Sequence, residues 1–99
     1  MRAHEHETAL ITGASEGIGR ELARIFAARG FEVVLVARNA ERLVQLAGEL
    51  SRQHGVRATP ISLDLTKPDA AGELFERVRS LGLRVDVLVN NAGLMEFGA

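Results

Sequence analysis

Three glycines near the N-terminus have the spacing of a turn that binds an anion. Gly13, Gly17 and Gly19 lie between the apolar run TALIT at residues 8–12 and a segment with helical periodicity. Glycine permits a tight turn at 13, close approach of a diphosphate to the backbone at 17, and close packing of helix on sheet at 19. The unpaired N–H groups and the positive dipole end of the helix start also favour an anion. The predicted chemistry is phosphate binding, to which Ser15 can add a hydrogen bond.

The glycine turn has two other interpretations. A turn can need glycine for its conformation alone, but the position between the first apolar run and the first helical segment favours ligand binding. The spacing G-x-x-x-G-x-G is neither G-x-G-x-x-G nor the P-loop pattern, and Arg20 stands where a P-loop has lysine. ATP hydrolysis of the P-loop kind is therefore disfavoured.

The elements that must position this turn alternate along the chain. Apolar runs at residues 8–12, 31–37, 56–65 and 85–90 predict strands, and segments at 17–29, 43–54 and 68–81 predict helices. The strands hardly alternate in polarity, which predicts a parallel sheet with helices on both faces. Right-handed crossovers give the strand order 3-2-1-4, a partial doubly wound α/β (Rossmann) fold, and Pro60 suits an edge of it.

The helical spacing also predicts which side chains face the core. In chain order these are Ile18, Leu22, Ile25 and Phe26; Leu43, Leu46, Ala47 and Leu50; and Leu74, Phe75, Val78 and Leu81. No repeat or linker divides the chain, so we expect one domain over residues 1–99, truncated after its fourth strand. Residues 1–7 are expected to be a disordered tail, and their HEHE segment predicts no metal site.

Composition excludes several classes of function. The 99 residues carry 12 basic and 13 acidic side chains, a net charge of −1, so no basic field attracts nucleic acid or an anionic membrane. Aromatic residues make up 4% and all are Phe, which argues against a surface that stacks bases. There is no cysteine, which excludes disulfides, thiolate nucleophiles and zinc sites with cysteine ligands. The first residues are too polar for a signal peptide, and no apolar run is long enough to span a membrane. We expect a cytoplasmic protein.

Two segments together resemble a known family. TGASEGIGR at residues 12–20 and NNAG at 90–93 are similar to the two N-terminal motifs of the short-chain dehydrogenase/reductase family, and DLT at 64–66 matches it too. The resemblance runs from Thr8 onward and covers less than half of a usual member. It implies a domain that binds a nicotinamide dinucleotide.

The resemblance implies positions for that dinucleotide. The diphosphate and ribose would be lined by the glycine turn, with Gly13, Ser15, Glu16, Gly17, Ile18 and Gly19. Asp64 and Leu65 would flank the adenine, with Asp64 accepting from its exocyclic amine; alternatively, Asp64 caps a turn or helix near Pro68. The adenosine ribose would be contacted by Asn91, Ala92 and Gly93. Asn90 would instead tie the fourth strand to its neighbours.

The end of the second strand predicts the choice between NADP(H) and NAD(H). A carboxylate there binds a free 2′-hydroxyl, whereas an arginine accommodates a 2′-phosphate. Arg38 occupies the position and offers a planar fork of donors, and Asn39 supports it or caps the next helix. The alternative is a solvated surface arginine. We expect NADP(H) to be favoured over NAD(H), although Glu16 stands where many NADP-preferring relatives place a base.

The resemblance implies reversible hydride transfer between nicotinamide and a carbonyl or alcohol. Related proteins use a Ser, a Tyr-x-x-x-Lys pair and another Asn, all beyond the NNAG motif, but this chain has no Tyr and its only lysine is Lys67. No catalytic residue is therefore predicted, and the chain alone is expected to be inactive. A small-molecule substrate would bind only a full-length relative. The alternative is a stand-alone nucleotide-binding or interaction module, one that pairs with a full-length relative through the open edge of the sheet. In either case the open edge predicts homo-association or pairing.

Overall fold

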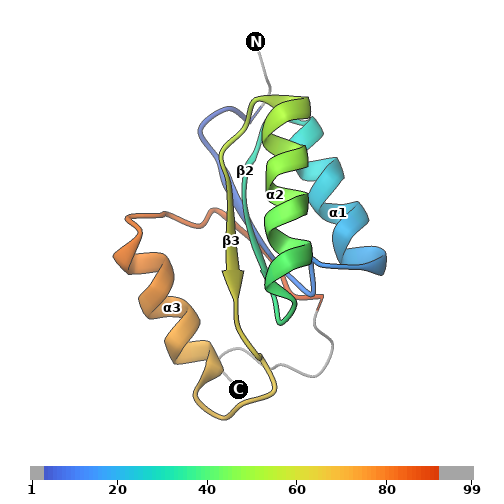
Figure 1. Ribbon diagram of the computed structural model, residues 1–99. Helices are drawn as coiled ribbons and strands as arrows, with labels where there is room; N and C mark the ends of the chain where they lie inside the picture. The colour runs from blue at the N-terminus through green and yellow to red at the C-terminus, as the bar shows by residue number, and fades with distance from the viewer. Residues whose placement is uncertain (1–3, 92–99) are drawn as a thin grey trace.

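Parallel strands and helices alternate through the part of the chain that the structure describes, residues 4–91 (Figure 1). The computed structural model contains, in chain order, β1 (Thr8–Thr12), α1 (Gly17–Ala28), β2 (Glu32–Ala37), α2 (Ala40–His54), β3 (Ala58–Ser62), α3 (Ala70–Ser80) and β4 (Val87–Val89). Every predicted element is present, and only the ends differ by a few residues from the predicted ranges.

The strands form one parallel sheet in the order β3-β2-β1-β4, which confirms the predicted topology. Leu10 at the centre of β1 pairs with Val34 of β2 on one side and with Leu88 of β4 on the other. Pro60 has no N–H to donate, and it lies in the edge strand β3 opposite Leu35. Because all strands run in the same direction, the loops that follow them meet at one edge of the sheet.

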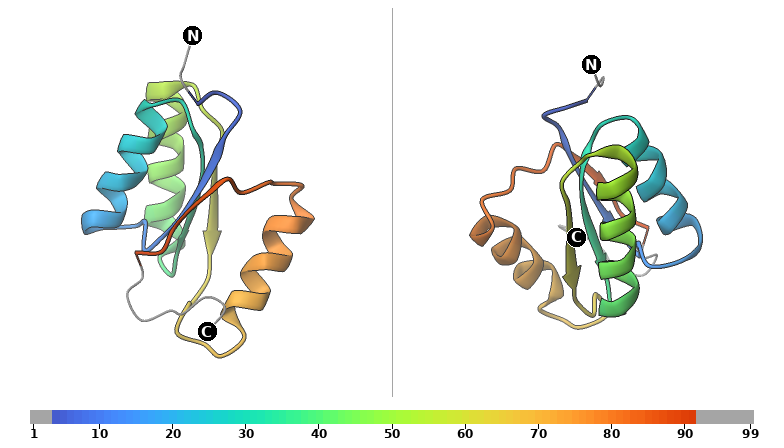
Figure 2. Two further views of the ribbon diagram at one scale, coloured as in Figure 1. Left: turned by 180° about the vertical axis from the view of Figure 1, so that it is seen from behind. Right: turned by 45° about the horizontal axis from the view of Figure 1, so that its top comes forward.

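Helices cover both faces of the sheet, as predicted. α1 and α2 lie on one face and α3 lies on the other, and the views in Figure 1 and Figure 2 agree on this arrangement. Ile11, Val33 and Leu35 belong to the core under α1 and α2, whereas Leu10 and Val34 belong to the core under α3. The alternation of side chains along each strand therefore supplies two separate cores.

Small residues form the core face of α1. Gly19, Ala23 and Ala27 are buried at four-residue intervals, whereas Ile18 is 72% exposed and Ile25 is 48% exposed. The prediction that Ile18 and Ile25 face the core was therefore wrong. Small side chains let the helix lie close to the sheet, and this close contact turns the branched side chains away from it.

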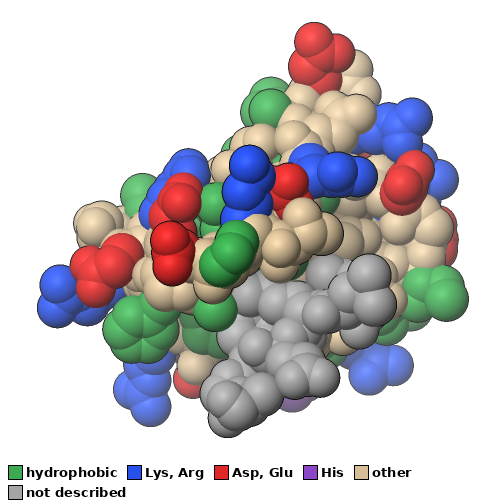
Figure 3. Space-filling view, turned by 90° about the horizontal axis from the view of Figure 1, so that it is seen from below, with side chains coloured by type: hydrophobic (Ala, Val, Ile, Leu, Met, Phe, Trp, Pro, Cys, Tyr) green, Lys and Arg blue, Asp and Glu red, His purple; other side chains and the backbone are tan. Residues whose placement is uncertain are grey.

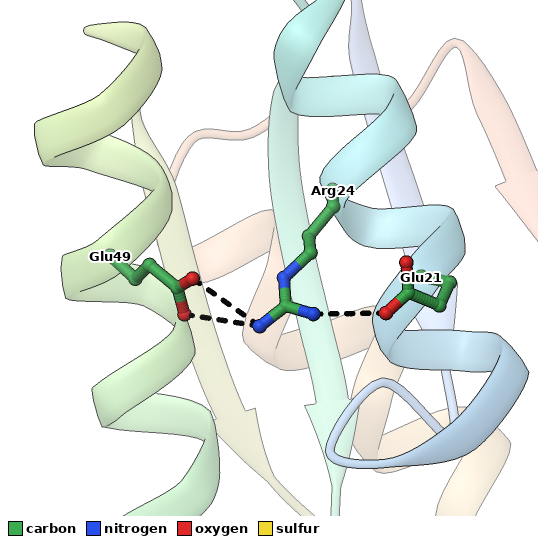
Figure 4. A network of polar contacts seen from close by, with 3 residues as sticks. All are labelled: Glu21, Arg24 and Glu49. Atoms are coloured by element: carbon green, nitrogen blue, oxygen red, sulfur yellow. Dashed lines mark hydrogen bonds and ion pairs between the residues drawn. The ribbon is translucent and has the colours of Figure 1, made fainter.

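An arginine links α1 to α2. Arg24 of α1 donates to Glu21 of the same helix at 2.9 Å and to the two carboxylate oxygens of Glu49 in α2 at 3.3 and 3.4 Å (Figure 4). Partly exposed ion pairs of this kind contribute up to about 1 kcal/mol. The apolar core beneath them is therefore the larger source of stability for this layer.

α2 has the face and the ends that the sequence predicts. The four side chains expected in the core are all buried. The helix begins after Asn39, whose side-chain oxygen accepts a hydrogen bond from the N–H of Arg42 at 3.0 Å. It ends at Gly55, which has a φ of +65° and so adopts the left-handed conformation that glycine tolerates at a helix end.

α3 covers the second face through a narrow contact. Phe75 is 69% exposed and Leu81 is 45% exposed, so the prediction that these two side chains face the core was wrong. The buried side chains of α3 are Ala70, Leu74 and Val78. An apolar cleft of about 370 Å³ lies beside α3, and its lining includes Leu10, Leu74, Phe75, Val78, Leu83 and Leu88.

The outer edge of β4 pairs with no other strand within residues 4–91. Leu88, in the middle of this strand, is 49% exposed. The sequence predicts self-association through this edge, because unpaired backbone groups of an edge strand can pair with another chain. That association stays a prediction.

Residues 4–7 form a turn beside the sheet, and the disordered tail that the sequence predicts over residues 1–7 stays a prediction. The ring of His4 stacks on Phe31 with 4.2 Å between centroids, and its Nδ1 lies 2.8 Å from Oε1 of Glu7. The carbonyl oxygen of Glu7 accepts from the N–H of Glu32 at 2.9 Å, which continues the pairing toward β2. This polar segment therefore packs on the aromatic ring of Phe31 through His4.

Two classes of site are absent from the described residues. No three His, Asp or Glu side chains gather there as they do around a metal ion. No helix within residues 4–91 has the length and the apolar character needed to cross a membrane.

Candidate functional site

The carboxyl ends of the four strands lead into one cleft of about 760 Å³. Figure 3 looks onto this edge of the molecule, where acidic and basic side chains lie next to one another. The described residues that line the cleft are Gly13, Ser15, Glu16, Ala37, Arg38, Asn39, Arg42, Leu63, Asp64, Leu65, Thr66 and Asn91. A cleft at this position in a parallel sheet is the usual ligand site of such folds.

The glycines of the turn are required for two different reasons. Gly13 and Gly17 have φ angles of +63° and +58°, in the left-handed region that costs other residues roughly 1–2 kcal/mol. Gly19 lies within α1, where a Cβ would overlap the carbonyl oxygen of Gly13 and lie 2.7 Å from Nδ2 of Asn91. The tight turn predicted at Gly13 and the close packing predicted at Gly19 are therefore confirmed.

The start of α1 offers hydrogen-bond donors to a ligand. A helix leaves its first N–H groups without intrahelical acceptors, and the side chain of Glu16, the N-cap residue, makes no capping hydrogen bond here. A Cβ at Gly17 would meet no described atom within 4 Å, so crowding is not the reason for glycine at this position. Open space beside a helix N-terminus suits a diphosphate, and the residues present fit that group.

Arg38 and Asn39 follow β2 directly and lie in the cleft. Arg38 is exposed, and its guanidinium has no hydrogen bond or ion pair with another residue in the range 4–91. Its carbonyl oxygen accepts from Oγ of Ser62 at 2.9 Å, which holds its backbone beside β3. Asn39 caps α2 through its side-chain oxygen, so the capping role predicted for it is confirmed.

Asp64 forms a turn of its own after β3. Its Oδ1 accepts from Oγ1 of Thr66 at 2.6 Å and from the N–H of Thr66 at 3.0 Å. These hydrogen bonds, with the charges of Arg38 and Lys67 nearby, hold the pKa of the Asp64 carboxyl below its usual value. The turn-capping alternative for Asp64 is therefore observed. It leaves room for a ligand, because Oδ2 has no partner among the described residues.

Thr12 fastens the end of β4 to β1, a role that the sequence analysis missed. Its fully buried side chain donates to Oδ1 of Asn90 at 3.1 Å and accepts from the N–H of Asn91 at 2.8 Å. The prediction that Asn90 ties the fourth strand to its neighbours is confirmed. A polar residue at the end of a buried strand is the signal that identifies such a link.

Arg42 is a second residue of the cleft that the sequence analysis missed. It lies in the first turn of α2, and its Nη1 donates to Oε2 of Glu16 at 2.8 Å. The position of Arg42 in the sequence could have indicated a special role. The positive dipole end of a helix disfavours a cation in the first turn, so an arginine there is unusual.

The cleft gathers most of the predicted site residues. Those that line it are Gly13, Ser15, Glu16, Arg38, Asn39, Asp64, Leu65 and Asn91. Gly17, Ile18 and Gly19 are not part of its lining, and Ala92 and Gly93 lie outside the described residues. The cleft holds arginine side chains and a carboxylate oxygen, and the N–H groups at the start of α1 follow directly after Glu16 in its lining. Together these groups suit a ligand that carries both phosphate groups and a hydrogen-bond donor.

Comparison of the sequence with known proteins gives a consistent result. The family model described as short chain dehydrogenase matches residues 7–99. Dehydrogenase/reductase SDR family member 7B of Bos taurus is 45% identical over 106 aligned positions, which cover 100% of this chain and 32% of that protein. The very-long-chain 3-oxoacyl-CoA reductase of Anas platyrhynchos is 40% identical over 88 residues, which cover 87% of this chain and 27% of that protein.

Solved structures show the same arrangement of elements. L-sorbose reductase from Gluconobacter frateurii, complexed with NADPH and L-sorbose, has a TM-score of 0.84 at 38% identity over 97% of this chain and 36% of that chain. A short-chain dehydrogenase from Sphingobium yanoikuyae in complex with NADPH has a TM-score of 0.80 at 43% identity over 94% of this chain and 36% of that chain. The present chain spans about a third of the length of these relatives.

Proposed function

The chain belongs to the short-chain dehydrogenase family, and from this premise we propose that it binds NADP(H) in the cleft at the carboxyl edge of its sheet. We also propose that it forms the dinucleotide-binding part of an oxidoreductase acting on a carbonyl or hydroxyl compound. The bound nicotinamide would supply the hydride chemistry. The residues of this chain bind and orient the dinucleotide.

The glycine turn and the start of α1 are proposed to hold the diphosphate. The left-handed conformations of Gly13 and Gly17 bend the chain there, and the first N–H groups of α1 are free of intrahelical acceptors. The positive end of the helix dipole adds a favourable field for the phosphate charges. Ser15 lines the same cleft and can donate a further hydrogen bond.

The loops after β3 and β4 are proposed to hold the adenosine. Asp64 would accept from the exocyclic amine of adenine through Oδ2, since Oδ1 already accepts two hydrogen bonds from Thr66. Leu65 lines the cleft beside it and offers an apolar contact to the ring. Asn91 lies against the glycine turn and would contact the adenosine ribose together with Ala92 and Gly93.

The position of Arg38 is the observation that supports NADP(H) over NAD(H). Arg38 follows β2 and lies in the cleft, and its guanidinium is unpaired among the described residues. At the same position a carboxylate would favour the free 2′-hydroxyl of NAD(H). A planar guanidinium can instead make paired hydrogen bonds to a 2′-phosphate.

No catalytic role is proposed for any residue of this chain. The tyrosine that family resemblance implies as the proton donor has no counterpart in the sequence. The 99-residue chain is therefore expected to bind dinucleotide without turnover.

Titration of the 99-residue chain with NADPH and with NADH tests the proposal, and the fluorescence of reduced nicotinamide reports both complexes. We expect NADPH to bind more tightly. Arg38→Asp replaces donors to phosphate by a carboxylate that repels it, so the preference for NADPH should fall by roughly ten- to hundredfold, the range for a hydrogen bond to a charged group. The control is Arg57→Asp, since Arg57 is exposed at the opposite edge of the sheet.

Three results would contradict the proposal. Equal affinity for the two dinucleotides would remove the preference for NADP(H). An unchanged preference in Arg38→Asp, or an equal change in Arg57→Asp, would remove the role of Arg38. Absence of binding to both dinucleotides would remove the proposed site.

A further inference from the structure

Glu16 and Arg42 form an ion pair inside the proposed dinucleotide cleft. Oε2 of Glu16 lies 2.8 Å from Nη1 of Arg42, and both residues line the cleft together with Arg38. Glu16 is the N-cap residue of α1, yet its side chain does not cap that helix. The carboxylate is therefore used for a contact between helices at the ligand site.

A negatively charged partner stabilises Arg42 at its position in α2. Arg42 lies in the first turn of α2, where the helix dipole presents positive charge, and Arg38 adds a second guanidinium to the lining of the cleft. Glu41 is the acidic residue in this first turn, but it does not line the cleft. Among residues 4–91, the carboxylate that forms an ion pair with Arg42 is that of Glu16.

A carboxylate and a phosphate make the same kind of contact with a guanidinium, namely charge-assisted hydrogen bonds to planar N–H donors. The carboxylate of Glu16 therefore occupies a position on Arg42 that a phosphate oxygen can take. The side chains of Arg42 and Glu16 are 55% and 73% exposed. Exposed ion pairs are weak, so a phosphate with a higher charge can displace this carboxylate.

We propose that Arg42 is a second specificity-determining residue for the 2′-phosphate of NADP(H), beside Arg38, and that Glu16 is its internal competitor. Binding of the phosphate exchanges the carboxylate of Glu16 for the ligand. This inference rests on the proposed function, because it assumes that the cleft binds the dinucleotide. It gives a physical role to the acidic residue in the glycine turn, which otherwise opposes binding of a phosphate.

A double-mutant cycle tests the inference, with the ratio of the dissociation constants for NADH and NADPH as its readout. Arg42→Gln should lower this ratio by roughly tenfold or more, the lower range for loss of a hydrogen bond to a charged group. Glu16→Gln should raise it by roughly two- to fivefold, the range for release of an exposed ion pair. The gain from Glu16→Gln should disappear when Arg42→Gln is already present, because the two residues act through one contact.

Two controls separate this contact from general electrostatics and from misfolding. Glu41→Gln removes a carboxylate from the same turn of α2 and should change the ratio by less than about twofold, as expected for a surface charge outside the contact. Arg42→Lys keeps the charge but not the planar fork, and should retain part of the preference. Far-UV circular dichroism of each variant verifies that the fold is retained.

The outcomes distinguish this inference from the proposed function. If the wild-type chain prefers NADPH but Arg42→Gln leaves the ratio unchanged, or if Glu16→Gln lowers the ratio, the inference is wrong and the proposed function stands. An equal gain from Glu16→Gln with and without Arg42 also overturns the competition. If the wild-type chain binds neither dinucleotide, the proposed function fails and the inference fails with it.

Discussion

Asp64 stabilises its own turn through one carboxylate oxygen and leaves the other oxygen for the proposed ligand. Its Oδ1 accepts both hydrogen bonds from Thr66 and so stabilises the turn after β3. Its Oδ2 is left for the adenine amine in the proposed complex. The two interpretations that the sequence left open for Asp64, a cap and a ligand contact, are therefore compatible.

Protonation of Asp64 is expected to destabilise the protein in acid. Its folded-state pKa lies below 3.8, the ordinary value that also applies to the unfolded chain. The stabilisation by the ionised carboxylate is therefore complete above about pH 3.8 and is lost as the pH falls through the lower, folded-state pKa. Asp64→Asn should lower the free energy of unfolding near neutral pH, and the difference from the wild type should shrink in stronger acid.

Urea unfolding of the wild type and of Asp64→Asn measures this difference in the free energy of unfolding. The two conditions are neutral pH and a pH well below the folded-state pKa of Asp64. Thr66→Val removes the hydroxyl donor and should reproduce part of the effect while the carboxylate remains. A difference between wild type and Asp64→Asn that is constant with pH would show that the ionised form is not the one that Thr66 stabilises.

Single residues differ in how far their roles can be predicted from the sequence. The glycine turn and the place of Arg38 in the cleft could be predicted, because glycine is favoured where φ is positive and residues that follow parallel strands meet at one edge of the sheet. Arg42 and Thr12 were not, because their roles depend on partners that are distant in the sequence. Arg42 contacts Glu16, 26 positions away, and Thr12 contacts Asn90, 78 positions away.

At the scale of elements, the placement of α1 depends on the absence of a side chain at Gly19. The helix starts within the glycine turn, at Gly17, and its buried face continues from Gly19 with Ala23 and Ala27. This close approach positions the N-terminus of α1 at the cleft. The turn, the helix and Asn91 at the end of β4 therefore form one packed unit.

Gly19→Ala should disrupt this unit. The added Cβ would overlap the carbonyl oxygen of Gly13, which is backbone and cannot move aside as a flexible side chain would. We expect a loss of about 1–3 kcal/mol in the free energy of unfolding, together with loss of NADPH binding. Chemical denaturation and the fluorescence titration measure the two effects.

Gly72→Ala is the matched control for this substitution. Gly72 lies inside α3, and a Cβ there would meet no described atom within 4 Å. Alanine has the higher helix propensity, so this variant should gain about 0.5–1 kcal/mol and keep its dinucleotide affinity. Equal stability changes in Gly19→Ala and Gly72→Ala would contradict the account of α1.

Periodicity predicted the helices correctly, but it predicted their buried faces less well. In α2 the apolar stripe of the sequence is the buried face. In α1 the stripe of large side chains is displaced from the small residues that contact the sheet, and in α3 Phe75 faces outward. Hydrophobic spacing indicates that a helix is amphipathic, whereas the distance between helix and sheet decides which side chains fit between them.

At the scale of the whole molecule, the two faces of the sheet are unequal. α1 and α2 cover one face with an extensive core, whereas α3 covers the other beside an apolar cleft. The order of the strands could be predicted because parallel strands and right-handed crossovers leave few alternatives. The apolar cleft could not, since it depends on where α3 lies across the sheet and not on the order of the elements.

The polar cleft at the carboxyl edge and the apolar cleft beside α3 provide a direct test of where a dinucleotide binds. An amide NMR titration of the 99-residue chain with NADPH follows both clefts in one experiment. We expect progressive shifts for the amides of residues 13–19, 38–42 and 64–66, with little change around Arg57 and Phe75. Shifts confined to the apolar cleft around Phe75 and Leu88, or none at millimolar NADPH, would contradict this expectation.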